Sequence, residues 1–182
     1  LKIAKYTRDY LLNNYQDVKV RLSRTTDVFV SLGNRTRDAN NWGADVLASI
    51  HINAATSSAT GYEDFIWNGT VSQNTRNLQN TIHAEMIKVF KNFRNRGKKR
   101  ANFHMLRESR MSAILPEFLF ITNKNDAAFL KNDSNLQLIA KHLAIGIAKH
   151  LNLKHKTNKP EPKPSGGVRT GNRLYHVQIG GF

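Results

Sequence analysis

Hydrophobic positions along the chain switch repeatedly between the spacing of a helix and the spacing of a strand. Apolar residues at three- and four-residue steps predict helices over 2–14, 31–42, 71–93 and 136–151, with a helical turn at 127–130. Alternating or continuous apolar runs predict strands over 18–22, 45–52, 62–67, 102–106 and 113–120. Because strands alternate with helices, we expect an α/β domain in which helices flank a mostly parallel sheet.

The pattern changes after residue 153. Segment 154–173 carries three of the four prolines and shows no apolar periodicity, which is typical of an extended basic linker. The final segment, 174–182, alternates like a strand but has no neighbouring strand in the sequence to pair with. We therefore predict a main domain over 1–153, a linker over 154–173 and the start of a second domain over 174–182.

The net charge of the chain indicates which kind of partner it binds. The chain of 182 residues has 28 Lys and Arg against 13 Asp and Glu, a formal net charge of +15, which favours a polyanionic partner. Nine basic residues and one acidic residue lie in segment 88–110, but aromatic residues are not interleaved with the 98–100 cluster as a nucleic-acid stacking surface requires. No apolar run is long enough to cross a membrane.

Two polar residues interrupt strands that are otherwise apolar. His51 lies near the carboxyl end of the 45–52 run, where sites of parallel sheets gather, so it is either a metal or catalytic residue or a core histidine with a polar partner. Glu117 interrupts the apolar 113–121 run. A buried carboxyl group has a raised pKa suited to general-base chemistry, and the alternative is a structural ion pair with an arginine. Because the chain has no cysteine, a metal would be held by histidines and carboxylates.

Several blocks of the sequence, taken in order, resemble one known family. They are Leu-Ser-Arg-Thr-Thr-Asp at 22–27, Ser-Ile-His-Ile-Asn-Ala at 49–54, the 100–107 block and Glu-Phe-Leu-Phe-Ile-Thr-Asn at 117–123. Over roughly 1–150 the chain is similar to zinc-dependent N-acetylmuramoyl-L-alanine amidases of the Amidase_3 type, which cleave peptidoglycan. The resemblance implies a Zn²⁺ cofactor, His51 as a metal ligand, Glu117 as the catalytic base and Arg107, at the end of its block, as a substrate-binding residue.

The sequence also departs from the family pattern. The family opens with a strand ending in Gly-His-Gly-Gly and a helix that begins with a glutamate, which together supply two zinc ligands, whereas this chain starts at Leu1 inside that helix. We therefore expect an N-terminally truncated or degenerate copy, with a sheet that lacks its first strand and with impaired zinc binding. Pro116 and Leu119 stand where the family has a small or apolar residue and a glycine, and we expect Leu119 to crowd the site.

The last nine residues resemble the opening strand of SPOR domains, which bind peptidoglycan. An amidase, a linker and a wall-binding module in this order would raise the effective concentration at the substrate. The resemblance implies a secreted, wall-associated monomer of a Gram-positive bacterium or phage, which acts on peptidoglycan and anionic wall polymers rather than on nucleic acid. The alternative function is a non-catalytic wall-binding module, and the sequence leaves autolysin, sporulation enzyme and endolysin open.

Overall fold

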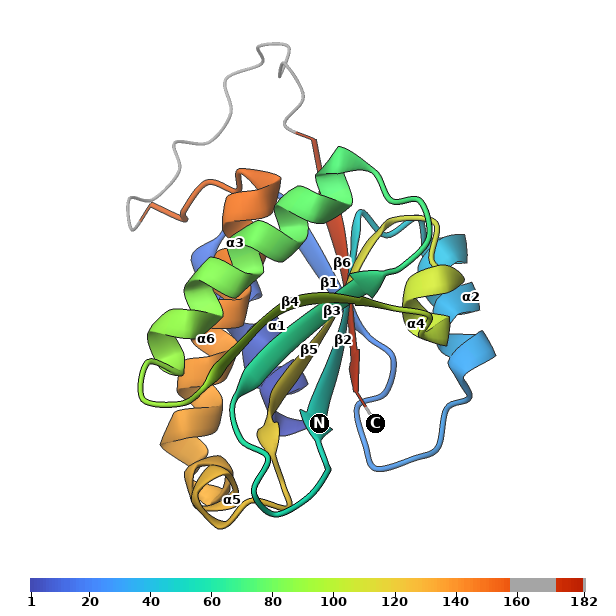
Figure 1. Cartoon of the computed structure of the whole chain (residues 1–182). Coiled ribbons are helices and arrows are strands. Elements are labelled where there is room, and N and C mark those ends of the chain that lie inside the picture. The colour runs from blue at the N-terminus through green and yellow to red at the C-terminus, as the bar shows by residue number, and fades with distance from the viewer. Residues whose placement is uncertain (158–172, 182) are drawn as a thin grey trace, which may run out of the picture.

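The computed structural model describes residues 1–157 and 173–181 as one layered α/β unit (Figure 1). A six-stranded sheet in the order β1-β6-β2-β5-β3-β4 lies between two layers of helices. The strands are β1 (Val18–Leu22), β2 (Val46–Asn53), β3 (Tyr62–Trp67), β4 (Asn95–Ala101), β5 (Ser112–Phe120) and β6 (Tyr175–Gly181). Neighbouring strands among β1, β6, β2 and β5 are parallel, whereas β3 is antiparallel to β5 and parallel to β4. The predicted mostly parallel sheet is confirmed.

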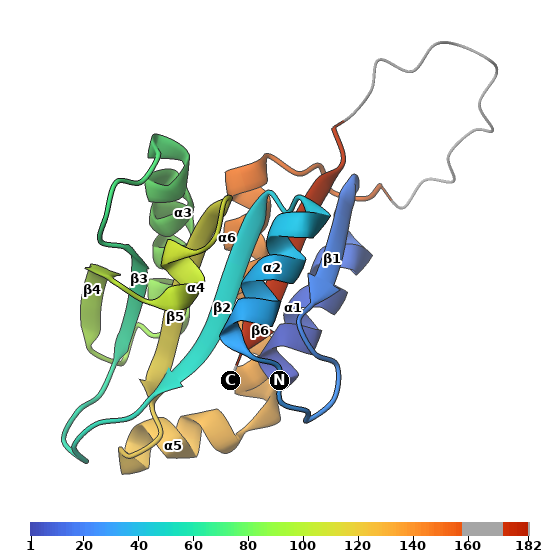
Figure 2. The same cartoon turned by 90° about the vertical axis from the view of Figure 1, so that its right-hand side faces the viewer.

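Helices cover the two faces of the sheet unequally. The helices are α1 (Lys2–Asn14), α2 (Leu32–Trp42), α3 (Gln73–Val89), α4 (His104–Arg107), α5 (Lys124–Lys131) and α6 (Asp133–Leu151). The apolar stripes of α1, α3 and α6 bury a large core against one face, with Leu11, Ile82 and Leu143 fully buried. Among the described residues, α2 and α4 pack over a smaller cluster on the other face. Figure 2 shows these two helices in front of the sheet. No helix of the described residues is long and apolar enough to cross a membrane.

The strand β6 lies inside the main sheet, a position that the sequence pattern does not predict. Tyr175–Gly181 fills the position between β1 and β2, parallel to both, and Val177 and Ile179 are fully buried. The expectation of a strand without a pairing partner is therefore wrong, because partners distant in sequence supply hydrogen bonds along both edges. The division into a domain, a linker and a second domain stays a prediction; residues 158–172 of the linker and Phe182 lie outside the described residues.

The segment between α3 and β5 differs from the prediction. A strand was expected over 102–106, but the strand is β4 at Asn95–Ala101 and the following residues form the short helix α4. The hydrophobic pattern misses β4 because it is an edge strand of mostly Lys, Arg and Gly, whose side chains have no apolar layer to enter. Charged side chains of this kind protect an exposed strand edge from pairing with other chains.

A bulge in β5 lies directly beyond Glu117. The register with β2 shifts between the pairs His51–Glu117 and Asn53–Phe120, so β5 has one extra residue there. Leu119 has a φ of 66°, a left-handed conformation that is uncommon without glycine. The Leu119 side chain is fully buried in the larger core rather than crowding the site, which corrects the expectation from the sequence.

Candidate functional site

Three polar residues occupy neighbouring positions on three adjacent strands. His51 of β2 pairs with Glu117 of β5, and Glu117 in turn pairs with Glu63 of β3. His51 and Glu117 together line a cavity of about 190 Å³ whose other walls include Phe103 and His104 at the start of α4. The structure therefore brings both predicted residues together, near the carboxyl ends of β2 and β5, where ligands of parallel sheets bind.

His51 is held as a neutral imidazole. Its Nε2 atom lies 3.0 Å from Oγ of Ser49, which is buried on the same strand. Burial, together with the positive charge of the buried Arg35, lowers the pKa of His51 to about 4. A neutral imidazole can ligate a metal or exchange hydrogen bonds with a ligand at neutral pH.

Glu117 is a carboxyl group poised near neutrality. Burial, together with the negative charge of Glu63, raises its pKa to about 7. Among the described residues, no hydrogen bond reaches its buried Oε2 atom. A carboxyl group with this pKa exchanges a proton readily at neutral pH, as a general base does.

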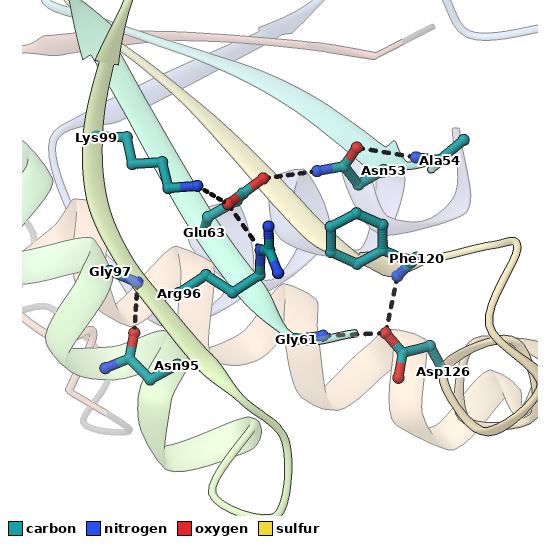
Figure 3. Close-up of polar contacts among 10 residues, drawn as sticks. All are labelled: Asn53, Ala54, Gly61, Glu63, Asn95, Arg96, Gly97, Lys99, Phe120 and Asp126. Atoms are coloured by element: carbon teal, nitrogen blue, oxygen red, sulfur yellow. Dashed lines mark hydrogen bonds and ion pairs between the residues drawn. The ribbon is translucent and has the colours of Figure 1, made fainter. Parts of the chain in front are cut away.

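Glu63 is a buried charged residue beside Glu117 that the sequence pattern does not single out. Its Oε1 atom accepts a hydrogen bond of 2.8 Å from Asn53. Its Oε2 atom accepts a hydrogen bond of 2.9 Å from Nε of Arg96 and forms an ion pair with Lys99 (Figure 3). Burial opposes ionisation, but the hydrogen bonds from Lys99 and Arg96 lower the pKa of Glu63 overall. The available signal is a charged residue that shares one face of a short strand with Phe65 and Trp67.

A second buried carboxylate fixes the backbone at this end of the sheet. Asp126 of α5 is fully buried and accepts hydrogen bonds from the backbone N–H groups of Gly61 and Phe120 and from the hydroxyl of Thr60. Figure 3 shows the two backbone contacts beside the Glu63 cluster. This carboxylate ties the starts of β3 and α5 to the end of β5, and therefore holds the strands that carry Glu63 and Glu117.

Arg107 does not join His51 and Glu117. It is exposed at the end of α4, where its Nε atom donates to Glu108 over 2.7 Å and its Nη1 atom donates to the side chain of Asn102. It lines a different cavity, of about 530 Å³, at the amino ends of β2 and β5 beside Trp67. The substrate-binding role of Arg107 stays a prediction, and the geometry gives it no contact with the Glu117 pocket.

The ligand set for a metal is incomplete. Within residues 1–157 and 173–181, no three His, Cys, Asp or Glu side chains lie close enough together to hold a metal ion. A catalytic zinc site takes about three protein ligands, and the residues of the right type that line this pocket, His51, His104 and Glu117, do not form such a group. The described residues therefore do not fit a complete zinc site.

Comparison with known proteins agrees with the resemblance seen in the sequence. Residues 1–149 match the family model Amidase_3, described as N-acetylmuramoyl-L-alanine amidase. Over 182 residues and the whole chain, the sequence is 44% identical to N-acetylmuramoyl-L-alanine amidase CwlM of Bacillus licheniformis. It is 46% identical, over the same length, to the sporulation-specific N-acetylmuramoyl-L-alanine amidase of Bacillus subtilis (strain 168). The chain spans 65% of the length of each of these relatives.

The fold also matches a solved structure. The N-acetylmuramoyl-L-alanine amidase of Clostridium difficile 630 superimposes with a TM-score of 0.77 at 34% sequence identity. The match covers 83% of this chain and 81% of that one. The layered arrangement of helices and sheet is therefore that of this enzyme class.

Proposed function

The chain belongs to the Amidase_3 family of N-acetylmuramoyl-L-alanine amidases, and from this premise we propose that it hydrolyses the amide between the lactyl group of N-acetylmuramic acid and L-alanine in peptidoglycan. The observation that carries the proposal is the pairing of His51 with Glu117 at the carboxyl ends of β2 and β5. Hydrolysis of an amide needs a base that activates water, and Glu117 has a pKa of about 7 in a partly enclosed cavity.

The proposed roles follow from the protonation states of the two residues. Glu117 takes a proton from the attacking water and can return it to the leaving amine of L-alanine, because its pKa lies close to the working pH. His51, which is neutral, can ligate the zinc that the family uses. Zinc in such enzymes polarises the scissile carbonyl. Because the described residues do not complete its ligand set, we assign no step to the metal.

The proposed setting is a bacterial cell wall outside the membrane. The net charge of +15 favours adhesion to polymers rich in phosphate and carboxylate, and segment 88–110 concentrates that charge around β4 and α4. Peptidoglycan and anionic wall polymers are therefore the proposed partners, and the secreted, wall-associated form is the proposed location. Both relatives described above are named as amidases of Bacillus, which supports the same setting.

A second function is favoured by one specific observation. The absence of a three-ligand metal group within the described ranges fits a non-catalytic module that binds the wall without cutting it. This alternative keeps the Glu117 pocket as a binding site.

One experiment separates the two functions. Purified Bacillus sacculi are incubated with the 182-residue chain and about 1 mM Zn²⁺, and both sedimentation of the protein with the sacculi and new alanine amino groups are measured. The amidase function predicts sedimentation together with a steady release of alanine amino groups, which EDTA stops. Sedimentation without release would reject the amidase function in favour of the binding module. Neither sedimentation nor release would reject both.

A further inference from the structure

A buried carboxylate anchors two cations on one flank of the Glu117 pocket. Only 6% of the Glu63 side chain is exposed, yet its Oε2 atom contacts both Arg96 and Lys99 of the edge strand β4. The Arg96 side chain is 24% exposed and the Lys99 side chain 37%, so both cations reach the surface. Figure 3 shows both side chains converging on Glu63 from β4.

The two cations are held in place rather than merely present. The Arg96 guanidinium lies 4.9 Å from the ring centroid of Phe120, and the Lys99 ammonium lies 5.7 Å from that of Phe65. These ring contacts and the shared carboxylate fix both side chains before any ligand arrives. An arginine held in this way loses little conformational freedom on binding an anion, because its planar fork is already oriented.

The cluster retains binding capacity and net positive charge. Of the three guanidinium nitrogens of Arg96, only Nε donates a hydrogen bond to a described residue. Both terminal nitrogens of the fork therefore remain for a ligand. Glu63 cancels one of the two positive charges, which leaves the group at +1. Arginine and lysine in such pairs recognise carboxylate and phosphate groups, the arginine through two parallel hydrogen bonds.

The position of the cluster indicates which part of a ligand it meets. Glu63 is the register partner of Glu117, and both lie on the face of the sheet covered by α4. A ligand whose amide reaches Glu117 therefore has one end near Arg96 and Lys99. In an N-acetylmuramoyl peptide the N-acetylated sugar is uncharged once its lactyl group is in the amide, whereas the peptide carries carboxylates beyond L-alanine.

We propose that Arg96 and Lys99, anchored by Glu63, form a carboxylate subsite that binds the peptide part of the ligand, at the residue that follows L-alanine. The inference rests on the proposed function, since it takes the ligand of the Glu117 pocket to be a muramoyl peptide. The proposed subsite is selective: a peptide with a free α-carboxylate at this residue binds more tightly than the same peptide with that α-carboxylate amidated.

Two ligands that differ in this one group provide the test. N-acetylmuramoyl-L-alanyl-D-glutamic acid has a free α-carboxylate, and N-acetylmuramoyl-L-alanyl-D-isoglutamine has an amide in its place, while both ligands keep the γ-carboxylate. Dissociation constants for the full chain are measured by calorimetry at pH 7.5 and low salt. We expect the acid to bind about five-fold more tightly than the amide, the range of a charge-assisted hydrogen bond at a partly exposed site. Equal dissociation constants would overturn the subsite.

Four variants locate the selectivity. Arg96→Gln and Lys99→Gln should each reduce the preference for the acid while binding of the amide stays within about two-fold. Lys98→Gln is the matched control, because Lys98 lies on the same strand but donates to Asn80 of α3. Arg96→Lys, which keeps the charge near Glu63 but loses the fork, serves if Arg96→Gln fails to fold, and it should also reduce the preference.

The remaining outcomes distinguish the subsite from the proposed function. A loss of preference in Lys98→Gln equal to that in Lys99→Gln would assign the effect to overall charge and overturn the subsite. If neither ligand binds, the proposed function fails, and the subsite fails with it. If both ligands bind equally, only the subsite fails.

Discussion

His51 and Glu117 are direct partners in the parallel ladder between β2 and β5, and burial shifts the pKa values of their side chains in opposite directions. The imidazole loses its proton more easily than in water, with a pKa of about 4, and the carboxyl group keeps its proton longer, to about 7. Both shifts favour the neutral forms, as desolvation requires. At neutral pH the pair therefore consists of an uncharged imidazole beside a carboxyl group that is close to half ionised.

These shifts predict stability changes of opposite sign with pH. Glu117 has a folded pKa above the usual 4.5, so its contribution is complete below pH 4.5 and is lost as the pH rises to 7. His51 has a folded pKa below the usual 6.5, so its contribution is complete above pH 6.5 and is lost as the pH falls to 4. Between pH 4.5 and 6.5 the two slopes oppose each other.

Single substitutions separate the two slopes. Urea unfolding of the wild type, Glu117→Gln and His51→Gln is measured at half-unit steps from pH 4 to 8. Relative to the wild type, Glu117→Gln should gain roughly 2 kcal/mol between pH 4.5 and 7, a value reduced for the partial exposure of the carboxyl group. His51→Gln should lose its deficit as the pH falls from 6.5 to 4. A difference independent of pH for Glu117→Gln would contradict the raised pKa.

His51 and Glu117 could be predicted from the sequence because their signal is local. Glu63 and the placement of β6 could not, because they depend on pairing between distant segments. A polar residue within an apolar strand is visible in a single stretch of sequence, which identified His51 and Glu117. The importance of Glu63 depends on pairing between β3, β4 and β5, and its partner Arg96 lies on a strand without an apolar pattern. The placement of β6 depends on contacts with β1 and β2, more than 120 residues earlier in the chain.

Gly61 controls the entry of the chain into β3. It has a φ of 109°, and a Cβ atom there would lie 2.0 Å from the carbonyl oxygen of Arg94. Gly61→Ala should therefore lower the free energy of unfolding by roughly 3 kcal/mol, from backbone strain and overpacking together. Gly33→Ala in α2 is the control: outside its own turn of helix, no atom lies within 4 Å of its Cβ position, and the variant should be unchanged or gain roughly 0.5 kcal/mol. Equal urea midpoints for the two variants would contradict the close approach at Gly61.

A substitution at Val177 tests whether β6 contributes to the stability of the sheet. Its side chain is fully buried between β1 and β2, so Val177→Ala should lower the free energy of unfolding by about 2 kcal/mol. Val28→Ala, at a position 51% exposed, should change it by less than about 0.5 kcal/mol. Hydrogen exchange should also show a protected amide at Val177. An unprotected amide and an unaltered stability would place 174–182 outside the domain core.

Zinc should bind this chain only weakly. Because no three His, Cys, Asp or Glu side chains of the described residues lie close enough together to hold a metal ion, the dissociation constant from calorimetry should be weaker than about 1 µM, and His51→Ala should weaken it further. EDTA should leave the free energy of unfolding unchanged, because no structural metal group exists in the described parts of the chain. A nanomolar dissociation constant would show that ligands beyond those described complete the site.

The role of Glu117 as the base is tested most directly by the rate at which alanine amino groups are released from purified sacculi at about 1 mM Zn²⁺. The wild type is compared with Glu117→Gln, which keeps the shape of the side chain, and with Glu108→Gln, which removes an exposed carboxylate paired with Arg107. The account predicts that Glu117→Gln lowers the rate by about 100-fold or more, while sedimentation with the sacculi and the rate of Glu108→Gln stay within about two-fold of the wild type. A Glu117→Gln variant that releases alanine amino groups at the wild-type rate would contradict it.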